Sequence, residues 1–477
     1  MVPRDLHHAP VGRGRQAIPE SLGSLVSQKA QGVNRHGTVS RSIFPVARAG
    51  DTVSPSGEEP SMASPKFMTA LGPGLLFAGA AVGTSHLVQS TRAGAVFGLG
   101  LLAVVILANV IKYPAFRFGA HYAAATGRSL VAGYRDLGWF PPLLLGAILI
   151  LADGFAVAAL SLVTAGIVKV VFGLEVSILT AVALVMAAAG AFLIIGGYHW
   201  LERLNKLFMA VLTVSTLIAT VLVLPKVDWS FYPASAPPID MKAMLFVAAL
   251  AGWMPTAMES SIFASLWTVE KAKDMGTKPS LEGVLADFNI GYWGTAILAI
   301  CFLLLGAGIM HSGAVEPADT APAFAAQIMA LYRDTLGAWA VPVIGIAALS
   351  VMFTTCLTAF DGLVRAFVAV VGALRAQPQP DQSGYEKKAY AATLLGFLVA
   401  AFLLLYFFLG GFKGFVDFVT SLAFLTAPVL AFFNHRVMMG SSVPDGDRPA
   451  PYLMHWSRAG IALMLLFAAG YLFLVFT

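Results

Sequence analysis

Eleven long apolar runs constrain this chain more than any other feature of its sequence. Each run holds about 20 mostly apolar residues, the length of an α-helix that crosses a lipid bilayer. A β-barrel is excluded, because barrel strands alternate polar and apolar residues with a period of two. In chain order, spans 1 to 11 cover 69–94, 97–120, 141–170, 176–196, 206–225, 243–267, 288–310, 338–372, 389–409, 414–434 and 458–476.

The composition indicates an all-α integral membrane protein. Of the 477 residues, 58% are hydrophobic and 12% are charged, whereas soluble domains carry about 25% charged residues. The net charge of +5 is spread over loops, so no nucleic-acid partner is predicted. Cys301 and Cys356 fall inside apolar runs, which favours buried thiols over a disulfide framework or a metal cluster.

The distribution of Lys and Arg between alternate loops predicts the orientation of the chain. More of these residues fall on the side of the N-terminus, with Lys112 counted there and Arg92 counted on the opposite side. Positive charge accumulates in cytoplasmic loops. We therefore expect a cytoplasmic N-terminus and an outside C-terminus, in the plasma (inner) membrane.

Three regions are expected along the chain. Residues 1–65 are rich in Ser, Gly, Pro and Arg and lack periodicity, which predicts a disordered segment. A translation start at Met62 or Met68 is left open. Residues 66–435 are expected to form a ten-helix core, and 436–477 a loop with a peripheral span 11.

Two spans carry polar or helix-breaking interruptions. Span 1 contains Gly83-Thr84-Ser85-His86, and in span 6 Gly252 and Pro255 bracket Trp253-Met254. Proline removes a backbone donor and clashes with the preceding turn, so the helix is expected to break there. Carbonyl groups freed inside a membrane need other partners, such as water, neighbouring helices or a substrate.

The two interruptions lie five spans apart. Two five-helix repeats of opposite topology place their first helices at spans 1 and 6, both broken near the midplane. This spacing predicts the LeuT-type fold with inverted five-helix repeats and about 11 transmembrane helices. The alternative explanation of the two interruptions is that glycine and proline are simply common in membrane helices.

Several segments resemble one known family in the same order along the chain. They are GPGLLFAGAAVGTSHLVQSTRAGAVFG in span 1, Ala251-Gly-Trp-Met254-Pro255-Thr256 in span 6, GYHWLERLNKLFMAVL between spans 4 and 5, IAALSVMFTTCLTAFDG in span 8 and FFNHRVMMG after span 10. Together they resemble the NRAMP family of proton-coupled divalent-metal transporters.

The resemblance implies metal ligation by the Ala251 carbonyl and the Met254 thioether. The chain departs from the family motif elsewhere. Gly83 stands where the family has a metal-binding aspartate, His86 where it has asparagine, and Thr256 where it has histidine. The resemblance therefore implies the fold more firmly than the substrate.

The predicted substrate-binding residues are Gly83, Thr84, Ser85, His86, Ala251, Met254 and Thr256. Within this set, His86 and Met254 are the metal-ligand candidates, since imidazole and thioether suit borderline or soft ions. Glu259 and Asp153 are the coupling or relay candidates, because an ionisable residue inside a membrane span is costly and usually has a functional role. Asp361 and Asp417 are interpreted as helix-end residues near water.

The leading functional hypothesis is a secondary transporter that moves a divalent transition-metal cation with ion coupling. The alternative is a carrier of a small anion or zwitterion (a bicarbonate-sized anion, a carboxylate or an amino acid) through a carboxylate-free site, because the ends of broken helices expose amides that attract anions. No HExxH or GxSxG motif is present in the spans, so no enzyme and no cofactor are predicted. The expected partners are a small solute or ion, the lipid bilayer, and a coupling proton or sodium ion.

Overall fold

The computed structural model describes residues 72–230, 240–311, 317–318, 320–375, 383–408 and 412–476. These residues all belong to one compact unit, Thr52–Thr477. Within the described ranges the regular elements are helices, with no strand. The predicted disordered segment 1–65 lies outside the described residues.

The described residues confirm the all-α class and the interruption of spans 1 and 6. Nine helices in these ranges are long and apolar enough to cross a membrane, and spans 1 and 6 are divided into shorter helices. Span 1 is α2 (Pro73–Ala81), η1 (Ser85–Ser90) and α3 (Thr91–Phe97), span 2 is α4 (Leu102–Thr126), and span 3 is α6 (Phe140–Ile148), η2 (Leu149–Asp153) and α7 (Gly154–Phe172). Spans 4 and 5 are α8 (Ile178–Val223), span 6 is α9 (Met241–Gly252) and α10 (Ser260–Met275), and span 7 is α11 (Leu281–Leu305) and η4 (Gly306–His311). Spans 8 to 11 are α13 (Ala340–Leu374), α14 (Ser383–Phe408), α15 (Phe412–Met438) and α16 (Pro451–Phe476), and the connections hold α5 (Leu130–Asp136) and α12 (Ala321–Leu336).

Local chemistry sets several helix ends. Before α11, the Ser280 Oγ accepts a hydrogen bond from the Gly283 N–H at 3.1 Å, which satisfies one of the free donors of the first turn. After α10, Gly276 has φ +65, a left-handed conformation that glycine adopts without a Cβ clash. The polar connections therefore start and stop the apolar helices.

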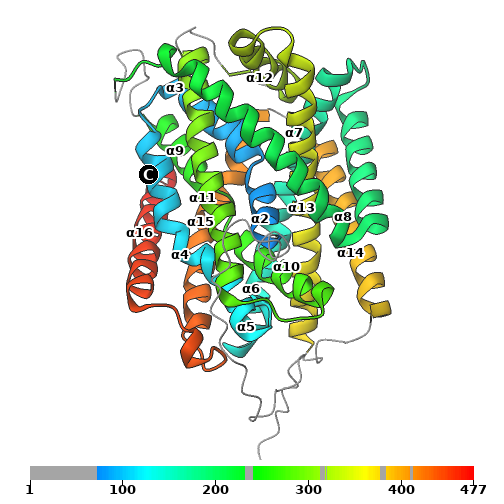
Figure 1. Ribbon diagram of the computed structural model, residues 1–477, viewed down its shortest axis with the longest axis vertical. Helices are drawn as coiled ribbons and strands as arrows, with labels where there is room; N and C mark the ends of the chain where they lie inside the picture. Colours follow the sequence, from blue (N-terminus) through cyan, green and yellow to red (C-terminus); the bar gives the residue numbers. More distant parts are fainter. Residues whose placement is uncertain are drawn as a thin grey trace, which may run out of the picture. The chain divides into compact units, whose positions relative to one another are not determined.

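The connection between spans 4 and 5 differs from the expectation. Residues 197–205 separate two predicted runs, yet they are helical, and α8 continues for 46 residues. A straight helix of that length would measure about 69 Å at about 1.5 Å per residue, more than twice the bilayer core of about 30 Å. Instead, α8 turns back near its middle (Figure 1), and its two apolar segments are Ile178–Gly196 and Trp200–Lys226.

Contacts between spans support two inverted repeats. Helix α2 of span 1 packs on α11 of span 7, and α10 of span 6 packs on α4 of span 2. The pseudo-symmetry that relates two inverted repeats maps span 1 onto span 6 and span 7 onto span 2. The contact between spans 1 and 7 is therefore the symmetry counterpart of the contact between spans 6 and 2. Helix α2 also contacts α10, so the two interrupted spans meet in the middle of the bundle (Figure 1).

Glycines let α2 and α11 touch backbone to backbone. A Cβ at Gly74 would stand 2.2 Å from the Asp287 carbonyl oxygen, and one at Gly291 would stand 2.1 Å from the Gly74 carbonyl oxygen. The Asp287 carboxylate also accepts hydrogen bonds from the N–H groups of Gly72 and Gly74, at 3.1 and 2.7 Å. Small residues allow this close approach in membranes, and the contact fixes the helix that leads to the first break.

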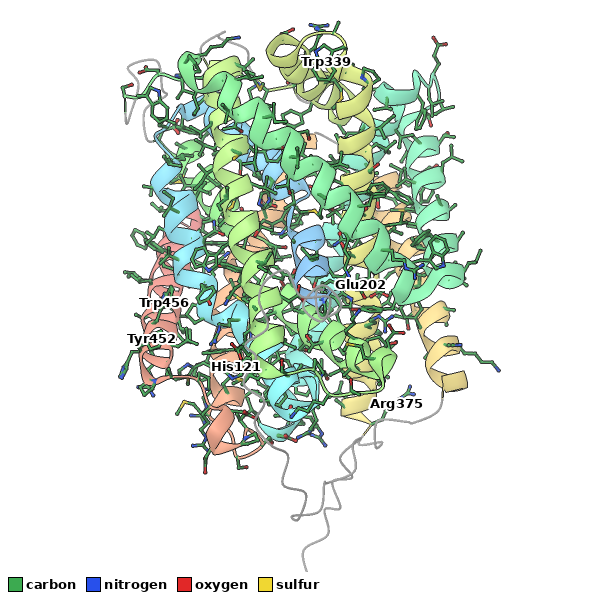
Figure 2. The ribbon with its side chains drawn as sticks, in the orientation of Figure 1. His121, Glu202, Trp339, Arg375, Tyr452 and Trp456 are labelled. Carbon is green, nitrogen blue, oxygen red and sulfur yellow. The ribbon has the colours of Figure 1, made fainter. Side chains whose placement is uncertain are left out.

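A second buried acid lies beside the start of α2. Glu202 of α8 lies next to Gly72, near the lower end of α2 in Figure 2. Its Oε1 accepts from the Lys271 Nζ at 2.9 Å and from the Lys206 Nζ at 2.6 Å. Charges that would be costly in a membrane bundle are thus paired across α8 and α10.

Candidate functional site

The break in span 1 lies at Val82 and Gly83, between α2 and η1. The Thr355 hydroxyl of α13 lies 2.8 Å from the Gly79 carbonyl oxygen and 3.2 Å from that of Val82. A Cβ at Gly83 would stand 2.5 Å from the Thr355 methyl carbon. Glycine therefore permits this approach, and the aspartate that the family motif places there would collide with Thr355 in this arrangement.

The break in span 6 separates Gly252 from Ser260. Pro255 has no N–H, so it cannot donate to the Ala251 carbonyl four residues earlier. The Lys112 Nζ of α4 donates instead, to the Ala251 oxygen at 2.6 Å and to the Gly252 oxygen at 2.9 Å. The Ala251 carbonyl, which we predicted to bind substrate, is therefore bonded to an ammonium group.

Lys112 and Arg92 are not loop residues, so the sequence-based orientation count was wrong for both. Lys112 is 3% exposed in the middle of α4, and Arg92 is 8% exposed in α3. Lys112 is the functional candidate that the sequence reasoning missed. Its position inside the apolar run 97–120 was the available signal, because an ionisable residue within a span is expensive unless it has a role.

A small cavity lies between the two breaks. About 40 Å³ of it is open to the centre of a water-sized sphere, which corresponds to about three water molecules at roughly 10–15 Å³ each. Spans 1, 3, 6 and 8 supply its wall. The residues of this wall that carry polar side-chain atoms are Thr84, Ser85, Asp153, Trp253, Thr256 and Ser260.

The structure brings together only part of the predicted substrate-binding set. Thr84, Ser85 and Thr256 line the cavity, and so does Asp153 from the predicted relay pair. Gly83, His86, Ala251 and Met254 are not members of the wall.

Several polar atoms at the cavity are buried without a hydrogen-bond partner within the described part of the chain. They are the Thr84 hydroxyl, the Asp153 Oδ2 and the Trp253 Nε1, with the Glu259 Oε2 adjoining the cavity residue Ser260. An unsatisfied buried polar atom costs about 1–3 kcal/mol. This set contains two acceptors, one donor and a hydroxyl that serves as either, so it is complementary to a solute with both kinds of group.

Asp153 and Glu259 reach the site from different spans. Asp153 ends η2, a π-helical turn within span 3, and such turns are frequent at functional sites. Glu259, 1% exposed, accepts a hydrogen bond from the Thr426 hydroxyl at 3.2 Å. Asp153 lines the cavity and Glu259 directly precedes the wall residue Ser260, so both predicted relay residues lie at the site, and the expectation of a carboxylate-free site was wrong.

His86 lies beside the cavity with both ring nitrogens engaged. Its Nε2 is 2.9 Å from the Thr295 carbonyl oxygen and its Nδ1 is 2.7 Å from the Ser85 hydroxyl. A carbonyl only accepts, so Nε2 carries a proton. The Ser85 hydroxyl also lies 2.6 Å from the Ala81 carbonyl oxygen. This arrangement leaves His86 no free lone pair toward the cavity, and its role as a metal ligand stays a prediction.

Met254 packs among apolar side chains. It is 0% exposed and belongs to the main hydrophobic core, and it is not among the residues of the cavity wall. Among the described residues, no group of three or more His, Cys, Asp or Glu side chains is placed to hold a metal ion. Metal binding by Met254 also stays a prediction.

Asp361 and Asp417, both interpreted as helix-end residues near water, differ in burial. Asp361 is 2% exposed, accepts from the Trp267 indole at 2.8 Å and pairs with Arg365 at 2.8 Å. Asp417 pairs with Arg92 at 2.9 Å. The interpretation as a helix-end residue near water was therefore wrong for Asp361, which lies buried inside α13. It agrees with Asp417, whose side chain is 33% exposed near the start of α15.

The pair between Arg92 and Asp417 ties the second half of span 1 to span 10. The Gln89 side chain donates to the same carboxylate at 3.1 Å, and the guanidinium lies 5.0 Å from the centre of the Phe246 ring. The Arg92 side chain is only 9% exposed, so removal of the Asp417 carboxylate would leave a buried charge without its salt-bridge partner. These polar contacts therefore hold the second half of span 1 against span 10.

We expect Asp417→Asn to loosen the second half of span 1. A Thr84→Cys reporter should then react with a water-soluble thiol reagent about tenfold faster, which corresponds to about 1.4 kcal/mol. The native Cys301 and Cys356 are buried, so they add little background. Asp445→Asn, in the exposed pair with Arg448, is the matched control, and equal rates in the two variants would contradict the prediction.

Two interrupted spans that face one small polar cavity, within inverted repeats, define a secondary transporter with the LeuT-type fold. The chain belongs to the Nramp family, because residues 74–474 match the family model described as natural resistance-associated macrophage protein-like. It is an integral membrane transporter and not an enzyme.

Individual relatives agree with this assignment. The chain is 34% identical over 375 residues to the uncharacterized protein PM0681 of Pasteurella multocida (strain Pm70), covering 78% of this chain and 85% of the relative. A mutant of the Eremococcus coleocola manganese transporter superposes with a TM-score of 0.63 at 13% identity, over 87% of this chain and 88% of that one. MhsT in complex with L-phenylalanine gives 0.55 at 16% identity, over 85% and 99%. These structural likenesses establish the fold.

Proposed function

We propose that this transporter carries a small zwitterionic solute, about the size of the smallest amino acids, by alternating access. The observation that carries the proposal is the cavity between the breaks. It contains the N-terminal end of α10 and an Asp153 carboxylate oxygen that has no hydrogen-bond partner among the described residues. We place the transporter in the inner membrane with its N-terminus in the cytoplasm.

Each end of a zwitterion has a complementary group in the cavity. An amine would pair with Asp153, while a carboxylate would meet the positive end of the α10 dipole at Ser260. The Trp253 indole and the Thr84 hydroxyl, which have no hydrogen-bond partner in the described part of the chain, would donate to the carboxylate. About three water volumes of space suit such a solute.

A divalent metal is the second candidate. Carboxylates and hydroxyls are ligands for hard cations, and Asp153 and Glu259 supply two carboxylates near the cavity. The likeness to a manganese transporter concerns the fold. Two observations weigh against a metal: an indole N–H cannot coordinate a cation, and the ammonium of Lys112 occupies the carbonyls of the span 6 break.

The proposed coupling ion is a proton, and its carriers are Asp153 and Glu259. Carboxyl groups inside membrane bundles form the proton relays of many transporters. Each of these two residues has one carboxylate oxygen without a hydrogen-bond partner in the ranges that the structure describes, and these oxygens would accept protons as a solute arrives or leaves. Sodium is the alternative coupling ion.

Uptake by the purified full chain in proteoliposomes tests the proposal. Labelled glycine and alanine, and separately Mn²⁺ and Zn²⁺, are offered under an imposed proton gradient, under a sodium gradient, and with neither. We expect accumulation of the zwitterions under the proton gradient. Acetate and methylamine, which each lack one charged end, should compete poorly.

The outcomes separate the candidates. Accumulation of a metal without zwitterion uptake would replace the first candidate by the second. Equal competition by acetate would reduce the substrate to an anion, and the assigned role of Asp153 would then be wrong. Dependence on the sodium gradient alone would overturn the proton proposal.

A further inference from the structure

The backbone carbonyls freed at the two breaks accept hydrogen bonds from different kinds of donor. At span 1 the freed carbonyls face the neutral Thr355 hydroxyl. At span 6 the carbonyls of Ala251 and Gly252 face the Lys112 ammonium, at 2.6 and 2.9 Å. The donor comes from α4, 139 residues away along the chain, and Lys112 is 3% exposed. The contact is therefore a built feature of the bundle interior.

The end of α9 is a natural cation site. The dipole of a helix places negative partial charge on its last carbonyls. In transporters with broken helices, unwound carbonyls and the C-terminal ends of half-helices bind the coupling cations. The ammonium group makes two short hydrogen bonds there, in the positions that an alkali or metal ion would use.

The surroundings hold the ammonium in place. A Cβ at Gly252 would stand 2.0 Å from the Thr420 carbonyl oxygen of α15, so α9 is wedged against span 10 on its other side. Gly252, whose carbonyl accepts from the Lys112 Nζ, is therefore fixed against span 10.

We propose that Lys112 is a resident cation, whose ammonium fills the cation site at the end of α9 so that no free alkali or metal ion binds there. The side chain acts as a specificity-determining residue, since a second cation at these carbonyls meets both steric exclusion and charge repulsion. The inference deepens the proposed function, because it explains why this cavity favours a solute over a metal, yet its test does not depend on uptake.

The test removes the Lys112 ammonium by mutation and measures whether an added free cation then stabilises the protein. Full-length wild type, Lys112→Ala and the control Lys278→Ala are melted in detergent with choline, Na⁺, Li⁺ or Mn²⁺ as the chloride salts. Lys278 is matched, because its Nζ caps the Ala125 carbonyl at the ordinary end of α4 at 2.8 Å. We expect Lys112→Ala to melt lower in choline and to regain about 2–4 °C or more in a small cation.

The other variants keep the result decisive. Lys112→Gln supplies a neutral donor and serves where Lys112→Ala does not fold; it too should gain stability from a small cation. Wild type and Lys278→Ala should respond equally weakly to all four salts. The proposal is overturned if every variant shows the same salt response, or if Lys112→Gln matches wild type in choline.

Failure of this inference is distinguishable from failure of the proposed function. A cation response confined to the Lys112 variants supports the resident cation even where glycine and alanine are not transported. Zwitterion uptake by wild type, with no cation response in any Lys112 variant, would leave the proposed function standing and remove the role of Lys112.

Discussion

Replacement of Asp153 by asparagine is expected to weaken zwitterion binding by at least about 30-fold while leaving the protein folded. The amide has nearly the shape of the carboxylate but no charge, so the amine of the solute loses its partner. Loss of one member of a buried charge pair costs about 2 kcal/mol or more, and about 1.4 kcal/mol is tenfold in affinity. Because Asp153 Oδ2 has no protein partner in the described residues, its removal breaks no internal contact there.

Competition uptake in proteoliposomes measures the affinity, and melting in detergent measures the fold. Asp228→Asn is the control, since Asp228 is fully exposed after span 5 and should leave both readings unchanged. An Asp153→Asn variant with wild-type affinity for glycine would show that the amine does not bind this carboxylate.

Replacement of Gly291 by alanine is expected to have the largest effect on folding. The added methyl would stand 2.1 Å from the Gly74 carbonyl oxygen, and a backbone atom cannot rotate away as a flexible side chain does. Overpacking in a core costs about 1–3 kcal/mol and occasionally more. We expect α2 and α11 to separate, with loss of a single gel-filtration peak and a lower melting temperature.

Gly294 on the same helix provides the matched control. A Cβ at Gly294 would meet no described atom within 4 Å, and alanine favours a helix over glycine by up to about 1 kcal/mol. Gly294→Ala should therefore melt at or above the wild-type temperature. Similar behaviour of the two variants would mean that the contact between α2 and α11 does not hold the first repeat in place.

Local pattern was sufficient to predict the spans and their interruptions. Runs of about 20 apolar residues have few alternatives to a membrane helix, and Pro255 lacks an N–H wherever it is placed. The family resemblance rested on the same local segments, and the family model confirms it over 74–474. The helical connection within α8 was missed, because its sequence has no feature, such as a proline, that tells whether a connection between two spans stays helical.

The sequence did not predict which side chains form hydrogen bonds with the polar groups at the two breaks. The Ala251 carbonyl was expected to be open to substrate, yet Lys112 of another span bonds to it. His86 was expected to face the substrate, yet Thr295 and Ser85 occupy its nitrogens. These contacts depend on side-chain direction and on helix rotation, which one residue added or removed in a span would change.

By itself, the sequence of this protein determined an all-helical membrane fold and the two positions where a helix cannot continue. Those properties follow from hydrophobicity and from the backbone chemistry of glycine and proline, which act within a few residues. Only the tertiary structure decided that Asp153 enters the cavity, that a hydroxyl serves one break, and that the ammonium of Lys112 serves the other. Such pairings join residues more than a hundred positions apart, and the packing of whole helices selects them.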